Sequence, residues 1–309
     1  MPSFTVITGY YSSTGECPPY VSAAKLNHSA YCASNGYRYC FSQQGFTASD
    51  KDYKSDMYIG CNAKPHLILQ ALDQCPHEDD HFVFWLDSDS YFTTFKSLDH
   101  LVLPGKDFFF TGDFADICNS GHLLVRNSPF SRRLLNAWIQ ASSISFPPDT
   151  TPFRLTPNGY AYGDQSILSA LLGAGLDYIS PSRLINGFLS TNGFSPFSHH
   201  YHHFLEKYAP LRQSSASRSI SLIHTSLRPH IHIYPQRKLN SYFYGPLAGH
   251  FHLGDNLVHF VSGSKHLLPS PSHLLPTGLY RPTLCTLLSS LFRSSFWSFK
   301  IFIKQLLRR

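Results

Sequence analysis

The sequence predicts an α/β fold built around a mostly parallel sheet, and three observations support this prediction. Short apolar runs alternate with helical patterns up to residue 89. The run at residues 82–86 contains no polar residue, which is typical of a strand buried on both faces. Two carboxylates, Asp87 and Asp89, follow this run directly, as expected where a buried strand reaches the sheet edge. The order strand–helix–strand–helix–strand requires right-handed crossovers and therefore parallel strands.

The first strand is expected at residues 4–7, followed by a polar, glycine-bearing loop at residues 8–15. A helix is predicted over residues 19–35. Pro19 suits its first position, and Gly36 suits the left-handed conformation that ends many helices.

The next elements continue the same alternation. A second strand is expected at residues 37–41, a helix from Ala63 to just before Pro76, and a third strand at residues 82–86. Further along, the patterns predict strands at residues 107–111, 122–126 and 176–179, and short strands at 220–224 and 230–234. They also predict two helices, at residues 129–138 and 164–172, and Ser128 is the expected N-cap of the first.

Bulk composition indicates a globular protein. The chain has 309 residues, enough for one large or two ordinary domains, and 42% of them are hydrophobic. The net charge is +6, and only Glu206 and Asp255 are acidic after Asp177. The basic excess therefore lies in the C-terminal part, among apolar residues rather than along a polar face, which argues against nucleic-acid binding.

The cysteines and the absence of an apolar leader indicate a reducing compartment. The seven cysteines include no Cys-x-x-Cys pair, and no segment reaches the roughly 18–20 apolar residues of a membrane span. Residues 266–283 read as a Pro/Ser linker, and residues 284–309 as a basic, aromatic-bearing amphipathic helix without acids. Such a helix is typical of an anionic membrane surface, although a helix docked on the domain is an alternative. We therefore expect a cytoplasmic protein, peripheral on the inner face of a membrane.

Asp87-Ser88-Asp89 is a candidate metal–diphosphate site. Ligands bind at the carboxyl ends of strands in open α/β sheets, and two carboxylates at this spacing can share a hard divalent cation. An exposed turn or a helix N-cap is the alternative explanation.

Three later motifs add sugar- and phosphate-binding chemistry. In Asn119-Ser120-Gly121, the amide suits sugar hydroxyls and the glycine allows close backbone approach, but a tight turn explains the motif equally well. Asp164-Gln165 at a helix start suits hydroxyl recognition, although Asp164 alone would serve as an N-cap. His259 can supply an imidazole ligand to manganese, although a histidine there is often structural.

Gly263 and Lys265, shortly after His259, suit phosphate contact. The histidines among residues 199–203 lack the spacing of a structural zinc site and fit a polar loop near an acceptor cleft.

Along the chain the motifs occur in the order Asp-x-Asp, Asn-Ser-Gly, Asp-Gln and a late His. In this order they resemble the motifs of one glycosyltransferase family. It includes the plant xyloglucan xylosyltransferases and the fungal Golgi mannosyl- and galactosyltransferases. The match covers residues 4–265, including the helix-to-strand junction at 30–37 and Ala63-Lys64-Pro65, which falls where the family has Trp-x-Lys. The stretch 180–256 is hard to align.

The resemblance implies a GT-A fold, a Rossmann-like α/β/α sandwich spanning residues 1–265. Its nucleotide-binding half would be residues 1–112 and its acceptor half residues 113–265. It also implies a retaining transfer of a hexose or pentose from a UDP- or GDP-sugar to a glycan or glycolipid acceptor, with Mn²⁺ (or Mg²⁺) as cofactor.

The resemblance also assigns roles to individual residues. Asp87, Asp89 and His259 match metal ligands, and Asp164 and Gln165 match catalytic residues that face the sugar ring. The remaining matches are donor-binding positions: Thr8, Gly9, Tyr10, Lys64, Asp87, Ser88, Asn119, Ser120, Gly121, Gly263 and Lys265.

Two departures from the family motifs affect these assignments. One extra residue separates His259 from Gly263, and Gly163 stands where the family has the first Asp of Asp-Asp-Gln. The eukaryotic members also carry an N-terminal membrane anchor that this sequence does not show.

Three other functions remain as alternatives. A haloacid-dehalogenase-type phosphatase would place its Asp-x-Asp on an early strand and would have Thr or Val where this chain has Tyr91. A sugar nucleotidyltransferase would have a basic loop after the first strand, and residues 8–15 have no basic side chain. An inactive carbohydrate- or membrane-binding module is the third alternative.

Overall fold

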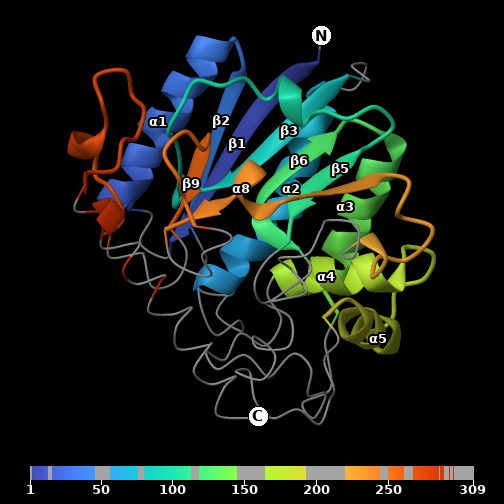
Figure 1. The fold of residues 1–309 in the computed structure, drawn as a ribbon. Coiled ribbons are helices and arrows are strands. Elements are labelled where there is room, and N and C mark those ends of the chain that lie inside the picture. Colours follow the sequence, from blue (N-terminus) through green and yellow to red (C-terminus); the bar gives the residue numbers. More distant parts are fainter. Residues whose placement is uncertain are drawn as a thin grey trace.

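The structure is a computed structural model that describes residues 2–12, 16–45, 56–75, 80–112, 118–144, 164–192, 220–243, 250–260, 267–284, 286–288, 292 and 295. A central sheet has the strand order β2-β1-β3-β6-β5-β7 (Figure 1). Its strands are β1 (Ser3–Ser12), β2 (Arg38–Gly45), β3 (His81–Asp87), β5 (Phe108–Thr111), β6 (Asn119–Arg126) and β7 (Ile231–Tyr234).

The central sheet is mostly parallel, as predicted. Strands β2, β1 and β3 run parallel, and β5 runs parallel to β7. Strand β6 is the exception, because it pairs antiparallel with both β3 and β5. Every residue of β3 before Asp87 is buried, which explains its continuous apolar sequence.

Helices cover both faces of the central sheet. Helix α1 (Pro19–Asn35) lies on one face, over the core cluster that contains Val6 and Phe84. The opposite face packs Ile7 and Trp85 against α2 (Asp56–Asp73), α3 (Pro129–Ser142) and α4 (Asp164–Ala174). The predicted α/β/α sandwich is therefore confirmed.

Local signals account for the helix ends. The bounds of α1 are those predicted, and Gly36 has φ 68°, the left-handed conformation that ends the helix. Helix α3 begins after Ser128, whose hydroxyl accepts a hydrogen bond from Ser131 N. Helix α2 begins earlier than predicted, at Asp56.

Several predicted elements were wrong. Residues 8–12 are not a loop, because β1 continues to Ser12 beside β2. Asn119-Ser120-Gly121 is not a turn but the start of β6. Residues 176–179 and 220–224 form no strand. Helix α5 (Pro181–Asn192), which packs against α4, was not predicted.

A second, three-stranded sheet was also not predicted. It has the order β4-β9-β8, with β4 (Ser90–Phe92), β8 (Ser241–Tyr242) and β9 (Leu257–His259). Strand β4 follows β3 after the turn that contains Asp89, and Ser90 pairs with His259 in the antiparallel β4–β9 register. This sheet therefore connects the carboxyl end of β3 to a segment far along the chain.

The predicted linker, residues 266–283, packs on the domain in its described part. Gly278 O accepts a hydrogen bond from Asn27 of α1, and Tyr280 N donates to Phe92 O of β4. This segment runs beside α1 in Figure 1. The predicted domain boundaries themselves stay predictions. None of the helices within the described part of the chain combines the length and the hydropathy needed to cross a membrane.

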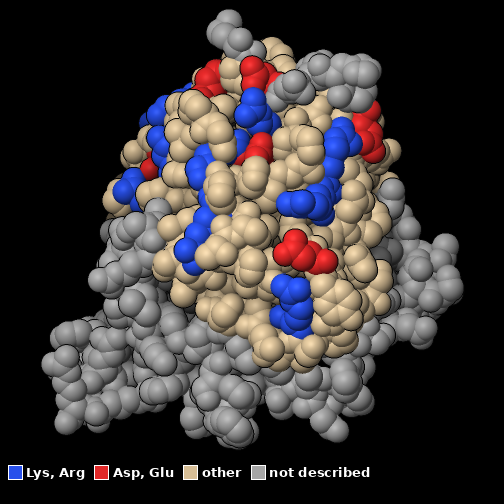
Figure 2. Space-filling model, turned by 90° about the vertical axis from the view of Figure 1, so that its right-hand side faces the viewer, with Lys and Arg blue, Asp and Glu red and all other residues tan. Residues whose placement is uncertain are grey.

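Charged side chains do not form a single basic stripe on the face shown in Figure 2. Lysine, arginine and acidic side chains are interspersed there over a mostly uncharged surface, among the residues that are described.

Candidate metal centre

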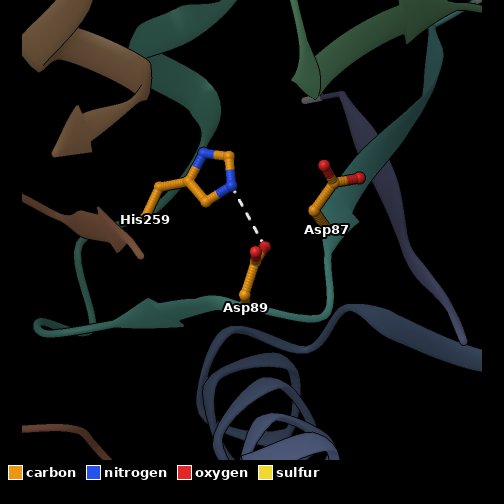
Figure 3. Close-up of side chains that lie close together, drawn as sticks. All are labelled: Asp87, Asp89 and His259. Carbon is orange, nitrogen blue, oxygen red and sulfur yellow. Dashed lines mark hydrogen bonds and ion pairs between the residues drawn. The ribbon is translucent and has the colours of Figure 1, made fainter. Parts of the chain in front are cut away.

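Asp87, Asp89 and His259 meet at the carboxyl end of β3. One ligand atom of each residue lies within 4.8 Å of the others. Figure 3 shows the two carboxylates flanking the turn after β3, with the imidazole of β9 approaching from the other side. His259 Nε2 lies 3.0 Å from Asp89 Oδ1. The sequence-predicted ligand set is thus brought together in space.

The β4–β9 pairing positions two of these side chains. Besides the register of Ser90 with His259, Phe260 N donates to Asp89 O at 2.9 Å. The His259 side chain is only 5% exposed and that of Asp89 14%, so both are held with little freedom. Ser88 lies in the turn between β3 and β4.

The two oxygens of Asp87 have different surroundings. Oδ1 accepts a hydrogen bond from Trp85 Nε1 at 2.8 Å and lies 3.1 Å from Lys64 Nζ. Oδ2 faces Gly121, where an added Cβ would lie 3.1 Å from Oδ2 and 2.7 Å from His259 Cε1. Only a residue without a side chain fits there, so Gly121 keeps open the space beside the two ligands.

Charge and burial act on the Asp87 carboxyl in opposite directions. Burial raises the pKa of Asp87, the Lys64 ammonium lowers it, and the neighbouring Asp89 raises it again. The net direction is upward. A positive charge placed between Asp87 and Asp89 would relieve both the repulsion and the burial cost, which favours a cation at this position.

Lys64 links the metal-ligand candidates to the predicted sugar-facing residues. Its ammonium lies 2.7 Å from Asp164 Oδ2 and donates to Ser120 O at 2.8 Å. Ser120 Oγ donates to Asp164 Oδ2 at 2.7 Å, and Ser120 N donates to Gln165 Oε1 at 3.3 Å. Asp164 and Gln165 lie in the first turn of α4. They therefore contact the start of β6 at Ser120, the residue that precedes Gly121.

The first-strand residues are placed differently from the prediction. Thr8 is buried, and its hydroxyl bonds to His28 Nδ1 at 2.9 Å. Gly9 pairs in register with Asp87. Tyr10 forms an edge-to-face pair with Tyr20 of α1, with ring centroids 6.2 Å apart. Gly9 and Tyr10 thus lie near the end of β3, but in a strand rather than a loop.

Several other predicted sites fall outside the described residues. Gly263 and Lys265 lie in the undescribed range 261–266, and the histidines at residues 199–203 lie in the range 193–219. Their roles stay predictions.

Sequence reasoning missed the polar residues that support His259. Asn240 is buried and its Oδ1 lies 3.0 Å from His259 Nδ1. Tyr242 accepts a hydrogen bond from Asn119 Nδ2 at 2.8 Å. Tyr242 lies in β8, and Asn240 directly precedes this strand. A strand of two residues has no readable periodicity, so no sequence signal identifies either side chain.

His122 completes the buried surroundings of His259. The two rings meet edge to face with centroids 4.9 Å apart. Burial lowers the pKa of His122 well below its usual value, and His259 lowers it further. His122 therefore stays neutral and adds no positive charge beside the candidate cation position.

No protein-family model matches the sequence, and a search of curated proteins found no match. Among solved structures, one similar chain is a glycosyltransferase involved in glycosylation of the major capsid of PBCV-1, with 14% identity and a TM-score of 0.49, covering 86% of this chain and 97% of that one. The glycosyltransferase GlyE of Streptococcus pneumoniae TIGR4 has 12% identity and a TM-score of 0.33; the match covers 85% of this chain but only 55% of GlyE. Mouse xyloside xylosyltransferase 1 has 9% identity and a TM-score of 0.36, covering 86% of this chain and 99% of that one.

Proposed function

We propose that the chain is a GT-A-type glycosyltransferase that transfers a hexose or pentose from a nucleotide-diphosphate sugar, with retention, to a glycan or glycolipid acceptor. The observation that carries this proposal is the meeting of Asp87, Asp89 and His259 at the carboxyl end of a buried strand, with ligand atoms within 4.8 Å. Ligands bind at this edge in open α/β sheets.

The donor set fits a divalent cation of the manganese type. Two carboxylates and one imidazole are a mixed oxygen–nitrogen set, suited to Mn²⁺ and, with its oxygens, to Mg²⁺. When bound, such a cation would stabilise the negative charge that develops on the departing diphosphate. Asp87, Asp89 and His259 would hold it, and the space beside Gly121 would leave room for diphosphate oxygens.

The sugar would lie beside Asp164 and Gln165. Their hydrogen bonds join them to Ser120, the residue before Gly121, and the Lys64 ammonium contacts both Asp164 and Asp87. Lys64 would orient Asp164 through its 2.7 Å contact. The nucleoside is assigned to the end of β1, at Gly9 and Tyr10, because Gly9 is in register with Asp87.

The test is a thermal-shift and turnover screen of UDP- and GDP-sugars with and without Mn²⁺. A true donor stabilises the folded state by mass action, by about 2.7 kcal/mol at a hundredfold excess over Kd. We expect one nucleotide-sugar to raise Tm only with Mn²⁺ and to release free nucleoside diphosphate when acceptor is added.

Two variants make this screen specific to the site. Asp89→Asn should abolish the Mn²⁺-dependent shift, whereas Asp80→Asn, which alters an exposed carboxylate paired with Arg126, should not. No shift with any nucleotide-sugar would contradict the proposal. A shift without nucleotide release would favour a binding module, and pyrophosphate release from a nucleoside triphosphate and a sugar phosphate would favour a nucleotidyltransferase.

We also propose that the C-terminal helical segment contacts an anionic membrane surface. Leu284, Leu288 and Phe292, spaced four residues apart, are 70%, 57% and 74% exposed. Leu287 packs against the domain, so this segment is docked on one side and apolar on the other. Residues 284–309 carry five basic residues and no acid, namely Arg293, Lys300, Lys304, Arg308 and Arg309.

Vesicle flotation tests this membrane proposal. Leu288→Glu should reduce binding to vesicles that contain phosphatidylserine, and deletion of residues 284–309 should abolish it. Leu253→Glu is the matched control, because Leu253 is 71% exposed elsewhere on the surface. Equal binding by all three proteins would contradict the proposal.

A further inference from the structure

His259 lies between two polar side chains. Its Nδ1 is 3.0 Å from Asn240 Oδ1, and its Nε2 is 3.0 Å from Asp89 Oδ1. Both partners are oxygens that accept hydrogen bonds. A neutral imidazole carries only one N–H, so it can donate to one of these oxygens and not to both.

The amide oxygen of Asn240 determines which nitrogen carries the hydrogen. It can only accept, so His259 Nδ1 must be the donor in that contact. In this orientation the amide nitrogen faces Tyr242 Oη, at 3.5 Å. With the hydrogen on Nδ1, the neutral ring presents a lone pair on Nε2.

The lone pair of Nε2 then faces the carboxyl group of Asp89. Nε2 and Asp89 Oδ1 are both electron-rich and lie 3.0 Å apart, so a positive charge must stabilise their approach. A cation held by Nε2 together with Asp89 and Asp87 would supply that charge. The contact with Asn240 therefore decides whether Nε2 offers a lone pair or an N–H to the carboxylates.

Asn240 is itself rigidly held. It is fully buried between α8 (Gln236–Leu239) and β8, and its backbone N donates to Gln236 O at 2.7 Å. Its neighbour Tyr242 accepts from Asn119 Nδ2, and Asn119 Oδ1 accepts from Gly121 N at 2.9 Å. One polar network therefore joins the support of His259 to the start of β6, beside Asp87.

We propose that Asn240 is a positioning residue that fixes His259 in the Nδ1–H tautomer and so directs its Nε2 lone pair to a divalent cation shared with Asp87 and Asp89. This inference rests on the proposed metal-dependent function. To that function it adds Asn240 as the group that orients the His259 imidazole before a cation binds. Outer residues that orient a ligating histidine typically change metal affinity about 10- to 100-fold when removed.

The tautomer can be measured directly in the metal-free protein. Long-range ¹H–¹⁵N NMR spectra of the ¹⁵N-histidine-labelled full chain, recorded where the rings are neutral, distinguish Nδ1–H from Nε2–H. The chain has 18 histidines, and the signal lost in His259→Gln identifies His259. We expect the Nδ1–H tautomer in the wild type. The Nε2–H tautomer there would overturn the proposal, whatever the variants do.

Two substitutions at residue 240 then test the consequence. Asn240→Leu removes the acceptor, and we expect mixed tautomers at His259 and Mn²⁺ binding weakened about 10- to 100-fold, measured by electron paramagnetic resonance. Asn240→Asp keeps an oxygen acceptor, and we expect both the tautomer and the affinity to stay near those of the wild type. Circular dichroism and thermal melting verify that each variant is folded.

The outcomes separate this inference from the proposed function. If the wild type binds no Mn²⁺, the metal-dependent function fails, while the NMR experiment still decides the tautomer. If the wild type binds Mn²⁺ and a folded Asn240→Leu binds it equally well with an unchanged tautomer, only the role of Asn240 is overturned. If Asn240→Leu does not fold, loss of the tautomer and affinity in Asn240→Asp would overturn the role, and their retention would support it.

Discussion

Lys64 and Asp164 form a buried ion pair, with Nζ 2.7 Å from Oδ2. Their side chains are 3% and 10% exposed. The same ammonium lies 3.1 Å from Asp87 Oδ1. One lysine of α2 thus balances two carboxylates that belong to different parts of the candidate site.

Loss of this lysine should destabilise the fold strongly. Lys64→Met leaves the buried carboxylate of Asp164 and the partly exposed one of Asp87 without their cation, and we expect the free energy of unfolding to fall by about 3–5 kcal/mol, measured by urea denaturation. Adding Asp164→Asn should recover part of this loss, because it removes one of the stranded charges. Asp73→Asn, at an exposed pair with Arg132, should cost less than about 1 kcal/mol. A loss of under 1 kcal/mol in Lys64→Met would show that the pair contributes little.

Trp85 should affect cation binding through Asp87. Trp85→Phe keeps an aromatic ring but removes the Nε1–H that donates to Asp87 Oδ1, so the carboxylate should lose its orientation. We expect Mn²⁺ affinity to fall about tenfold or more, measured by titration. Trp138→Phe is the matched control, since Trp138 is buried and its Nε1 has no hydrogen-bond partner among the described residues. Equal affinities in the two variants would contradict a role for the indole.

Gly121 should not tolerate even a methyl group. In Gly121→Ala, the new Cβ would lie 2.7 Å from His259 Cε1 and 2.9 Å from Asn119 Oδ1. We expect a stability loss of about 1–3 kcal/mol together with weakened Mn²⁺ binding. Gly105→Ala strains a positive-φ glycine away from the site, so it should lower stability and leave Mn²⁺ binding intact. Normal binding in a folded Gly121→Ala would show that the space beside the ligands is not needed.

The buried His28 should make the fold sensitive to acid. Its Nε2–H donates to Ser90 O, its Nδ1 accepts from the Thr8 hydroxyl, and burial lowers its pKa to about 4 from an ordinary value of about 6.5. Because the folded-state pKa lies below the unfolded one, stability is full above pH 6.5 and falls as pH decreases towards 4. The full difference is worth about 3 kcal/mol.

Stability measured by urea denaturation against pH tests this expectation. His28→Gln keeps a donor for Ser90 O but cannot be protonated, so its stability should fall less between pH 6.5 and 4 than that of the wild type. His252→Gln removes an exposed histidine and should leave the wild-type slope unchanged. Parallel curves for the wild type and His28→Gln would argue against a titrating His28.

The sequence predicted those elements whose signals are local. Helix α1 was predicted at both ends because Pro19 and Gly36 act on neighbouring backbone groups. Strand β3 was predicted because burial on both faces leaves a continuous apolar run. Asp87, Asp89 and His259 were predicted as ligands by residue type and by resemblance, and the structure brings them together.

The sequence did not predict the features that depend on contacts between distant segments. The end of β1 was read as a loop because this stretch is polar and contains Gly9, a residue type depleted in strands, yet β2 pairs along it to Gly45. Strands β4, β8 and β9 are two or three residues long, too short for a periodicity to appear. The ion pair between Lys64 and Asp164 depends on the packing of α2 against α4, and no local sequence pattern predicts that packing.

The pairing of β4 with β9 also sets the order in which the site can be completed during synthesis. Asp89 and His259 are 170 positions apart, so the two carboxylates leave the ribosome long before the imidazole does. A nascent chain can form β1, β2 and β3 before His259, the third ligand candidate, has been synthesised. The parallel pairing of these strands involves only residues that precede His259 in the sequence. Full affinity for a cation would therefore arise only after β9 has been synthesised and has paired with β4.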